Sequence, residues 1–434
     1  MIINFSVSNF RSIRDEVTLS FEASRSDEME KHYVINTVKN LRVLKLGIIY
    51  GPNASGKTNL LEALEFLRSI ATKPIGTKTG EFDFEPFLFD DSSRVQNTVF
   101  TLEFVSNQVK YLYRVELNRK CVVRESLDYY MPNSAKVFSR TTDQTKQLVD
   151  IEFGSKIRIP ADGRKALAGN TLWNNTVIGG YLKTNIDSRE LHDVAEWFKS
   201  FLKPVIRPDS NLVPFIFSKF ESDETGRETQ LRILQKAGFD ISDLKYKRDQ
   251  LEVNEELLNY LNREIPIPAE QIKKIRNRGM VDIKNLLVQH TVNGREHLLP
   301  LESESRGTKR YIELGGVLAA LLRGDVVISI DELESSMHPD LVKHFILTFL
   351  MNSGNSQLIA TTHMRELLLE KEILRNDVIW FMEQKEDASS DLFCLSDFDT
   401  SVVRKSSSIY NAYKIGRLGA VPDLGDYYLG IADE

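Results

Sequence analysis

Two segments that lie far apart in this chain have the patterns expected of the two halves of one nucleotide-binding site. Residues 51–58 (GPNASGKT) match the phosphate-binding loop pattern G-x-x-x-x-G-K-[ST] at every fixed position. Residues 326–332 (VVISIDE) form an apolar run that ends in two adjacent carboxylates. Thr58 and Asp331 would have to meet at one Mg²⁺ ion. The two ends of the chain are therefore expected to build one domain, with other residues inserted between them.

The residues around the first segment supply the strand and the helix that such a loop needs. Residues 43–50 are typical of a buried strand, and leucines at helical spacing follow Lys57. Backbone N–H groups and the helix dipole would then face a phosphate. We expect Lys57 to reach the β- and γ-phosphates and the Thr58 hydroxyl to ligate Mg²⁺. The predicted nucleotide-binding residues of this segment are Gly51, Asn53, Ala54, Ser55, Gly56, Lys57, Thr58 and Asn59.

The second segment and a later histidine predict the catalytic part of the site. Asp331 is expected to hold Mg²⁺ directly or through water, and Glu332 to polarise the attacking water. Residues 358–363 (LIATTH) are typical of another buried strand, and they end in His363. Its position favours a γ-phosphate sensor, with a structural histidine as the alternative. Lys57, Glu332 and His363 are thus the predicted catalytic residues, and Thr58 and Asp331 the predicted metal ligands.

Composition limits the class of protein. With 41% hydrophobic and 27% charged residues, the chain has the composition of an ordinary globular protein of two or three domains. A net charge of −6 provides no overall basic field for nucleic acid, and two cysteines do not make a disulfide framework. The longest apolar stretch, residues 314–322, is too short to span a membrane. We expect a cytoplasmic α/β protein with no membrane partner.

Strand and helix patterns divide the chain into three parts. Alternating residues between 2 and 21, and again at 95–105, 109–117 and 121–130, predict an antiparallel subdomain. Helical patterns replace them after about residue 160, including a charged one at 244–265. We expect residues 1–160 and 285–434 to form the ATPase head, and 161–284 a mainly helical insert. Phe82, Phe84, Phe87 and Phe89 are assigned to a core or a sheet face, with base stacking as the alternative.

One further element resembles a second phosphate-binding cap. In residues 302–310 (ESESRGTKR), Ser305 and Gly307 stand at the start of a predicted helix. A serine that only caps the helix is the alternative interpretation. The position of this element shortly before Asp331 favours the cap.

Together these motifs resemble the ABC-type ATPase heads of the SMC and RecF kind. Asn9-Phe10-Arg11-Ser12 is similar to their N-terminal turn, so Arg11 joins the predicted nucleotide-binding residues. Ser305 and Gly307 stand where the signature motif of that family lies, although Arg306 replaces its usual first glycine. The resemblance implies that two heads sandwich two ATP molecules, the loop of one facing the signature of the other. It therefore implies a homodimer or higher homo-oligomer.

The tail, residues 413–422 (YKIGRLGAVP), gives a narrower resemblance to the RloA/AbiLi-type ATPases of abortive infection, with the ATPase subunit of PARIS-type systems as a related comparison. It implies an anti-phage switch that responds to a phage-derived trigger and controls a separately encoded effector, such as a Toprim-like nuclease. The alternative is a DNA-repair or recombination ATPase that loads on DNA. The basic residues Lys273, Lys274, Arg276 and Arg278 suit that alternative, but a solvated helix face is the simpler interpretation. A transporter subunit and a GTPase are both disfavoured.

Overall fold

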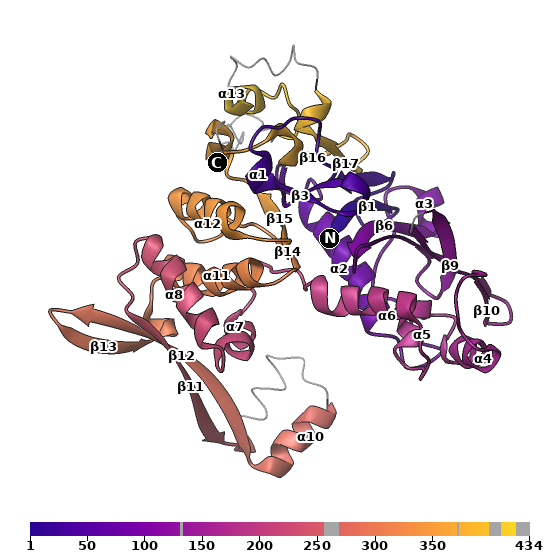
Figure 1. Ribbon diagram of the computed structural model, residues 1–434, viewed down its shortest axis with the longest axis horizontal. Helices are drawn as coiled ribbons and strands as arrows, with labels where there is room; N and C mark the ends of the chain where they lie inside the picture. The colour runs from indigo at the N-terminus through magenta and orange to yellow at the C-terminus, as the bar shows by residue number, and fades with distance from the viewer. Residues whose placement is uncertain (131–132, 256–268, 371–372, 399–408, 422–434) are drawn as a thin grey trace, which may run out of the picture. The chain divides into compact units, whose positions relative to one another are not determined.

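The computed structural model describes residues 1–434 except 131–132, 256–268, 371–372, 399–408 and 422–434 (Figure 1). It divides into two compact units. The first comprises Met1–Pro208, Gly324–Ser335 and Leu350–Glu434, and the second comprises Asp209–Arg323 and Ser336–Phe349. Within the described ranges, no helix combines the length and the apolar character needed to cross a membrane.

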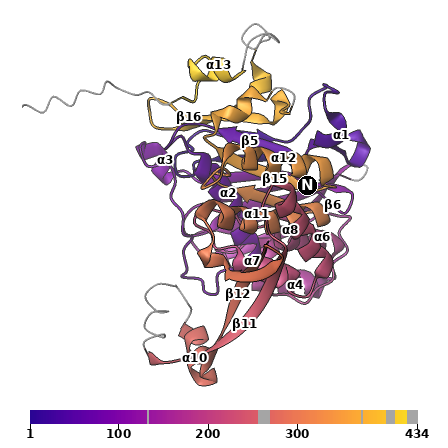
Figure 2. The same ribbon diagram turned by 90° about the vertical axis from the view of Figure 1, so that its left-hand side faces the viewer.

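A five-stranded sheet forms the centre of the first unit. Its order is β14-β15-β5-β16-β17, and all neighbours are parallel except the antiparallel pair β16–β17. Figure 2 shows β5, from the N-terminal part of the chain, beside β15 and β16 from the C-terminal part. The prediction that both ends of the chain build one α/β core is confirmed. The strands are β5 (Leu46–Tyr50), β14 (Val327–Ile330), β15 (Gln357–Thr362), β16 (Ile379–Gln384) and β17 (Ser390–Cys394).

A seven-stranded antiparallel sheet forms the subdomain expected from the N-terminal sequence. Its order is β10-β9-β8-β7-β6-β1-β2. Asn107 and Gln108 connect β6 to β7 with φ angles of 46° and 62°, which are the left-handed values that a tight two-residue hairpin turn requires. The predicted meander is confirmed, and β9 and β10 extend it. The strands are β1 (Ile2–Ser8), β2 (Val17–Ser20), β6 (Thr98–Ser106), β7 (Val109–Leu117), β8 (Val122–Tyr130), β9 (Ser134–Asp143) and β10 (Leu148–Phe153).

The two sheets are joined by buried contacts. The Gln357 side chain at the start of β15 donates to the carbonyls of Ile2 (2.9 Å) and Leu44 (3.0 Å), and it accepts from the Ile2 N–H.

Phe82, Phe84 and Phe87 are buried, whereas Phe89 is 78% exposed. The assignment to a core is therefore correct for the first three phenylalanines and wrong for Phe89, because that ring contacts Phe87 only at its edge.

Helix α2 (Lys57–Thr72) follows β5 and buries Leu60, Leu61, Leu64 and Leu67, as its spacing predicts. Apolar side chains are buried as well on α6 (Arg189–Glu196) and on the π-helical turn η2 (Trp197–Phe201), where the ring centroid of Trp197 lies 4.3 Å from that of Phe104. The remaining elements of this unit are α1 (Glu30–Tyr33), β3 (Val34–Asn36), β4 (Arg42–Leu44), α3 (Asp91–Val95), α4 (Ala161–Asn170), α5 (Val177–Tyr181), α6 (Arg189–Glu196), η2 (Trp197–Phe201) and α13 (Ile409–Lys414).

The second unit contains helices and one long antiparallel sheet, β11-β12-β13 (Figure 1). On α11, a Cβ at Gly316 would stand 2.7 Å from the Ile216 side chain of α7, so glycine permits close packing there. The elements are α7 (Val213–Phe220), α8 (Glu224–Lys236), β11 (Asp243–Glu252), α10 (Ala269–Arg278), β12 (Met280–Val292), β13 (Arg295–Pro300), α11 (Arg306–Arg323) and the start of α12 (Pro339–Asn352).

One expectation in this region is wrong. The start of the predicted helix at 244–265 is strand β11, and residues 256–265 lie outside the described residues. Leu244 is buried and the Tyr246 hydroxyl donates to Gln230 at 2.9 Å, while Lys245 and Lys247 are exposed. That alternation has the period of a strand. Helices still predominate among the described residues of 161–284, although the compact units divide the chain near residues 208 and 323 instead of 160 and 284.

Candidate nucleotide-binding site

The loop between β5 and α2 has the tight backbone that its two glycines allow. A Cβ at Gly51 would stand 2.2 Å from the Met382 carbonyl oxygen. Gly56 has a φ of 103°, and a Cβ there would stand 2.2 Å from the Ser390 hydroxyl. Ala54, at a φ of 64°, is a non-glycine residue in the left-handed region. No larger residue fits at Gly51 or Gly56, and the loop leads directly into the N-terminus of α2.

The side chain of Lys57 lies buried against the loop. Its ammonium donates to the carbonyls of Gly51 (2.9 Å) and Pro52 (2.8 Å). Burial lowers the pKa of Lys57 to about 8, although Asp331, Glu332 and Glu334 act in the opposite direction. The buried Ser55 hydroxyl has no partner among the described residues. A buried cation and a free hydroxyl on a loop of backbone N–H groups are what a phosphate ligand needs, so these residues fit a nucleotide.

A chain of hydrogen bonds joins the loop to β14 and β15. The Thr58 hydroxyl donates to Asp331 Oδ2 at 2.8 Å, and the Thr361 hydroxyl donates to Asp331 Oδ1 at 2.6 Å. The same Thr361 oxygen accepts from the Glu332 N–H at 2.8 Å. Thr58 and Asp331 therefore meet as predicted, and both are oxygen donors. Two protein ligands fit Mg²⁺, since that ion keeps several of its waters.

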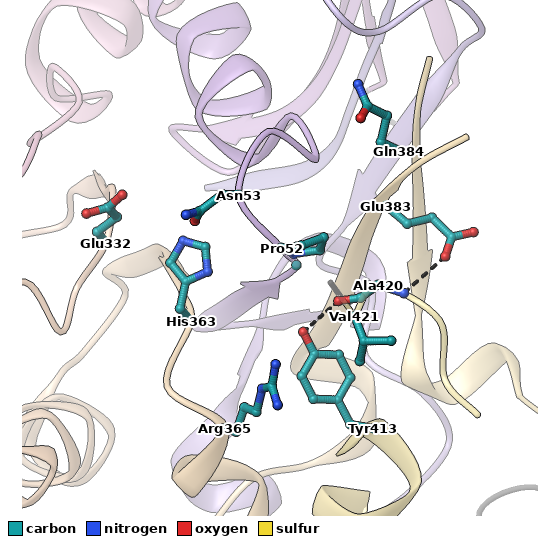
Figure 3. Close-up of a pocket in the computed structure, with 11 residues that line it drawn as sticks. Pro52, Asn53, Glu332, His363, Arg365, Glu383, Gln384, Tyr413, Ala420 and Val421 are labelled. Atoms are coloured by element: carbon teal, nitrogen blue, oxygen red, sulfur yellow. Dashed lines mark hydrogen bonds between the residues drawn. The ribbon is translucent and has the colours of Figure 1, made fainter. Parts of the chain in front are cut away.

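The backbone of Glu332 is held in an unusual conformation. Its φ is 47°, which is rare for a residue with a Cβ. The bond from its N–H to Thr361 fixes the peptide, and the side chain points into the cavity described below (Figure 3). Strained backbone of this kind is concentrated at functional sites.

His363 follows directly after β15. Its backbone N–H donates to Glu334 Oε1 at 2.6 Å. Burial and then the nearby Lys57 ammonium lower the pKa of the His363 imidazole below its ordinary value. The ring is therefore neutral at neutral pH, with one nitrogen able to donate and the other able to accept a hydrogen bond.

A cavity of about 930 Å³ lies next to these groups, at the carboxyl ends of the parallel strands (Figure 3). That volume lies in the range of about 300–1,000 Å³ usual for small-molecule sites, and the position is where open α/β sheets bind ligands. Of the predicted residues, Gly51, Asn53, Glu332 and His363 line the cavity. Lys57 bonds to the loop carbonyls of Gly51 and Pro52, and Thr58 bonds to Asp331. Among the described residues, the lining consists of Gly51, Pro52, Asn53, Glu332, His363, Arg365, Glu383, Gln384, Tyr413, Ala420 and Val421.

Seven of these lining residues were not among the predicted site residues, and one of them, Pro52, lies within the loop itself. Arg365 follows His363, Glu383 and Gln384 end β16, and Tyr413, Ala420 and Val421 belong to the C-terminal segment. The tail pattern at 413–422 was the only available signal for the last group, and Pro422 lies outside the described residues. The position of the tail beside the cavity could not follow from the sequence, because it depends on the pairing of β16 with β5.

Arg11 and Asn59 lie away from this cavity. The Arg11 guanidinium pairs with Glu62, and the residue lines a separate cavity of about 330 Å³ with Phe10 and Arg207. The Asn59 amide donates to the Ser12 hydroxyl at 2.7 Å, and Ser12 also accepts from Ser390 at 2.7 Å. The turn that contains Arg11 and Ser12 thus packs beneath Gly56 and supports the loop.

Ser305 and Gly307 belong to the second unit. The Ser305 hydroxyl accepts from the Thr308 N–H at 3.2 Å, so it caps α11. A Cβ at Gly307 would stand 3.0 Å from the Ser336 carbonyl oxygen, which makes the approach of these two segments tight. Helix capping is therefore observed, and the contact of Ser305 and Gly307 with a phosphate stays a prediction.

The parallel sheet, the loop after β5 and the carboxylates after β14 define a P-loop ATPase of mixed α/β class. Residues 47–370 match the family model described as "AAA domain, putative AbiEii toxin, Type IV TA system". This match spans more than half of the chain, and the protein belongs to that family. None of the curated proteins compared with the chain matches it.

Three solved structures are similar to the chain at low identity. One is the SMC head bound to the C-winged helix domain of ScpA, with 14% identity, 95% of this chain and 99% of that chain covered, and a TM-score of 0.42. The SMC head domain from Thermotoga maritima has 14% identity, coverages of 91% and 98%, and a TM-score of 0.41. The Smc head with an extended coiled coil bound to the C-terminal domain of ScpA, from Pyrococcus furiosus, has 10% identity, coverages of 96% and 98%, and a TM-score of 0.40.

Proposed function

We propose that this protein binds and hydrolyses ATP with Mg²⁺ at the site between β5, β14 and β15. The observation that supports this most directly is the pair of hydrogen bonds by which Asp331 joins Thr58 and Thr361. Lys57 and the loop N–H groups bind the phosphates, and Thr58 and Asp331 hold the metal. Bound Mg²⁺ neutralises phosphate charge and orients the phosphate oxygens.

Glu332 orients the attacking water and accepts its proton, and His363 hydrogen-bonds the γ-phosphate. A neutral imidazole suits that contact because it can donate one N–H without the cost of charging a half-buried ring. The Thr361 hydroxyl couples the two carboxylates, since it bonds the side chain of Asp331 and the backbone of Glu332.

Glu332→Gln tests the catalytic assignment. This variant should bind ATP as the parent does, hydrolyse it at least about 100-fold more slowly, and accumulate an ATP-stabilised assembly in size-exclusion chromatography. Lys57→Ala should instead lose nucleotide affinity. Glu366→Gln, an exposed carboxylate on the same segment as His363, is the matched control and should behave as the parent. Hydrolysis by Glu332→Gln at the parental rate would exclude Glu332 as the catalytic base.

We further propose that the active form is a homodimer, or a higher homo-oligomer, that sandwiches ATP between the loop of one subunit and the Ser305–Gly307 segment of another. In a mixed dimer, Ser305→Arg and Lys57→Ala should complement each other, because one composite site then keeps both parental halves. If the mixture of the two variants shows no turnover, while the parent prepared in the same way is active, that result would argue against a shared site. Analytical ultracentrifugation with ATP and with ADP measures the assembly itself.

The biological role that we propose is a nucleotide-driven switch in anti-phage defence of the abortive-infection kind. The family description, which includes a putative AbiEii toxin, and the tail resemblance to RloA/AbiLi-type and PARIS ATPases support it. In this role the cytoplasmic ATP-bound assembly detects a phage-derived trigger and releases a separately encoded effector such as a nuclease.

Phage challenge tests this role in cells. The gene and its neighbours, expressed together, should lower plaque formation, and Glu332→Gln and Lys57→Ala should each abolish that protection. The effector should co-purify with the ATP-bound assembly and dissociate after infection. Protection that persists in Lys57→Ala would contradict a nucleotide-driven switch.

A second candidate, an ATPase that loads on DNA, is favoured by one observation. Lys273, Lys274, Arg276 and Arg278 are all exposed on the single helix α10. The Arg276 guanidinium already pairs with Glu255 at 3.2 Å, so part of this charge is compensated within the protein.

A further inference from the structure

The C-terminal segment forms a wall of the nucleotide cavity. After α13 the chain closes in a helix-ending turn, with the Arg417 N–H donating to the Ala412 carbonyl and the Gly416 N–H to the Tyr413 carbonyl. The chain then folds back, and the backbone of Ala420 forms hydrogen bonds with the side chains of Tyr413 and Glu383. The Tyr413 hydroxyl donates to the Ala420 carbonyl at 2.7 Å, and the Ala420 N–H donates to Glu383 Oε2 at 3.1 Å (Figure 3).

This wall has little freedom to adopt another shape. A Cβ at Gly419 would stand 2.5 Å from Glu383 Oε2, and Gly419 and Ala420 have φ angles of 63° and 53°. Tyr413 is 3% exposed, and its ring stacks on Phe381 of β16 at 5.3 Å. The glycines and the tyrosine of the tail pattern therefore hold the wall against β16, the strand that pairs with β5.

Arg365 lies against this wall and lines the cavity. Its guanidinium carbon stands 5.6 Å from the centre of the Tyr413 ring. Figure 3 shows Arg365 beside Tyr413, on the segment that follows His363, and Asn53 next to the His363 ring. Within the part of the chain that the structure describes, Arg365 forms no ion pair with a carboxylate. Glu383, the acidic lining residue nearest to the wall, is engaged by the Ala420 N–H.

An arginine in this setting is suited to an anion. Its side chain is half-buried, and the cation–π contact with the Tyr413 ring restricts the position of the guanidinium. A cation held in a cavity without a counter-charge is stabilised when a ligand supplies one, and the fork of N–H donors matches the oxygens of a phosphate. His363, two residues earlier in the chain, is the group to which the γ-phosphate contact is assigned above.

We propose that Arg365, positioned by the Tyr413 ring, binds the terminal phosphate of the nucleoside triphosphate, so that the C-terminal wall distinguishes the triphosphate state from the diphosphate state. This inference rests on the proposed ATPase function and adds a residue to it. The ring of Tyr413 positions Arg365, while the hydroxyl of Tyr413 holds the chain at Ala420 through its hydrogen bond to that carbonyl. The anion that Arg365 binds is the last phosphate of ATP, and ADP lacks it.

The test compares dissociation constants for ATP and for ADP, measured by calorimetry in a Glu332→Gln background that does not turn ATP over. Arg365→Ala should weaken ATP binding by about tenfold or more and change ADP binding less than about twofold. Arg365→Lys should recover part of the loss, because a point charge remains without the planar fork. Arg417→Ala, an exposed arginine of the same segment, is the control and should change neither constant.

Two substitutions at Tyr413 distinguish the role of its ring from the role of its hydroxyl. Tyr413→Leu should lower ATP affinity in the same selective way as Arg365→Ala, and Tyr413→Phe should keep the preference for ATP because the ring remains. If Arg365→Ala loses affinity for ATP and for ADP equally, Arg365 has a structural role and the proposal is wrong. The proposal is also wrong if this variant keeps its affinity for both nucleotides.

Two further outcomes are distinguishable from these. If inorganic phosphate alone binds the parent, and Arg365→Ala removes that binding while ATP affinity is unchanged, the cavity holds a separate anion and the proposal is wrong. If the Glu332→Gln parent binds neither nucleotide, the proposed function fails first, and this inference fails with it.

Discussion

The hydroxyl of Thr58 donates to the carboxylate of Asp331 at 2.8 Å, although 273 residues separate them in the sequence. Replacing either partner should therefore disrupt the same metal site. Thr58→Val and Asp331→Asn should each lower Mg²⁺-dependent ATP hydrolysis by about 100-fold or more. Because Asp331 remains in Thr58→Val, higher Mg²⁺ should restore part of its activity. Thr72→Val, the same substitution at the end of α2, is the control. Full activity in both site variants would exclude this pair as the metal ligands.

Thr361 couples the two carboxylates from a fully buried position. In Thr361→Val, Asp331 loses a donor and the Glu332 N–H loses its acceptor. We expect the free energy of unfolding, measured in urea without nucleotide, to fall by about 1–3 kcal/mol, together with a loss of hydrolysis. Ser329→Ala on β14 is the matched control. That hydroxyl is buried without a partner among the described residues, and its removal should change stability by less than about 0.5 kcal/mol. Equal effects of the two substitutions would contradict the coupling.

The lowered pKa of Lys57 predicts that nucleotide binding depends on pH. Its pKa of about 8 in the free protein means that ATP binding above that pH must take up a proton. The dissociation constant should rise by about tenfold per pH unit from about pH 8 upward, until the pKa of Lys57 in the complex is reached. Calorimetry in buffers of different ionisation enthalpy measures the proton uptake. Lys57→Arg stays protonated and should remove the dependence, and a constant affinity up to about pH 9.5 in the parent would contradict it.

The same shift affects stability with a defined sign. Between about pH 8 and the ordinary lysine pKa of 10.5, the unfolded chain holds this proton and the folded chain does not. The contribution of Lys57 to the free energy of unfolding therefore rises with pH through that window. Below about pH 8 the folded protein keeps a buried charge at Lys57, at a cost that a bound phosphate would offset.

The basic residues of α10 predict how a DNA-loading ATPase would behave. If Lys273, Lys274, Arg276 and Arg278 contact the phosphate backbone, affinity for duplex DNA should fall steeply with salt. Neutralising all four should reduce the slope of log K against log salt by roughly 0.9 for each lost contact. Fluorescence anisotropy measures both effects. A variant with Arg119, Lys120, Lys146 and Lys156 changed to alanine, all exposed in the first unit, is the control. No salt-dependent binding would leave the defence switch as the sole candidate.

The predictable parts of the fold are those whose conformation depends on residues close together in the sequence. Gly51 and Gly56 allow a backbone that no other residue tolerates, and the leucines after Lys57 repeat at the spacing of a helix face. The hairpin of β6 and β7 follows from alternation around a short turn. Strand β11 was missed because its alternation is short and lies within a charged stretch.

The site residues that were missed depend on tertiary structure. Arg365 and Tyr413 meet only because β16 pairs with β5, and neither has a sequence pattern that specifies the other. Arg11 was assigned to the nucleotide by resemblance, and in the structure its guanidinium pairs with the largely buried carboxylate of Glu62 on α2. Asn59 stands three residues before Glu62, on the same face of that helix, and so contacts the Arg11–Ser12 turn.

The central position of β5 determines when the protein can first become active during its synthesis. Gln357, whose amide bonds the Leu44 carbonyl just before β5, is made 313 residues after Leu44. At about 5–20 residues per second, a ribosome needs roughly 15–60 seconds to cover that distance, and β16 follows later still. Throughout that interval the apolar strand β5 has neither of its partner strands, β15 and β16, so its apolar residues stay unburied. A polypeptide that ends before β16 carries the complete phosphate loop but lacks Glu383, Tyr413 and Ala420, so it cannot form the cavity described above.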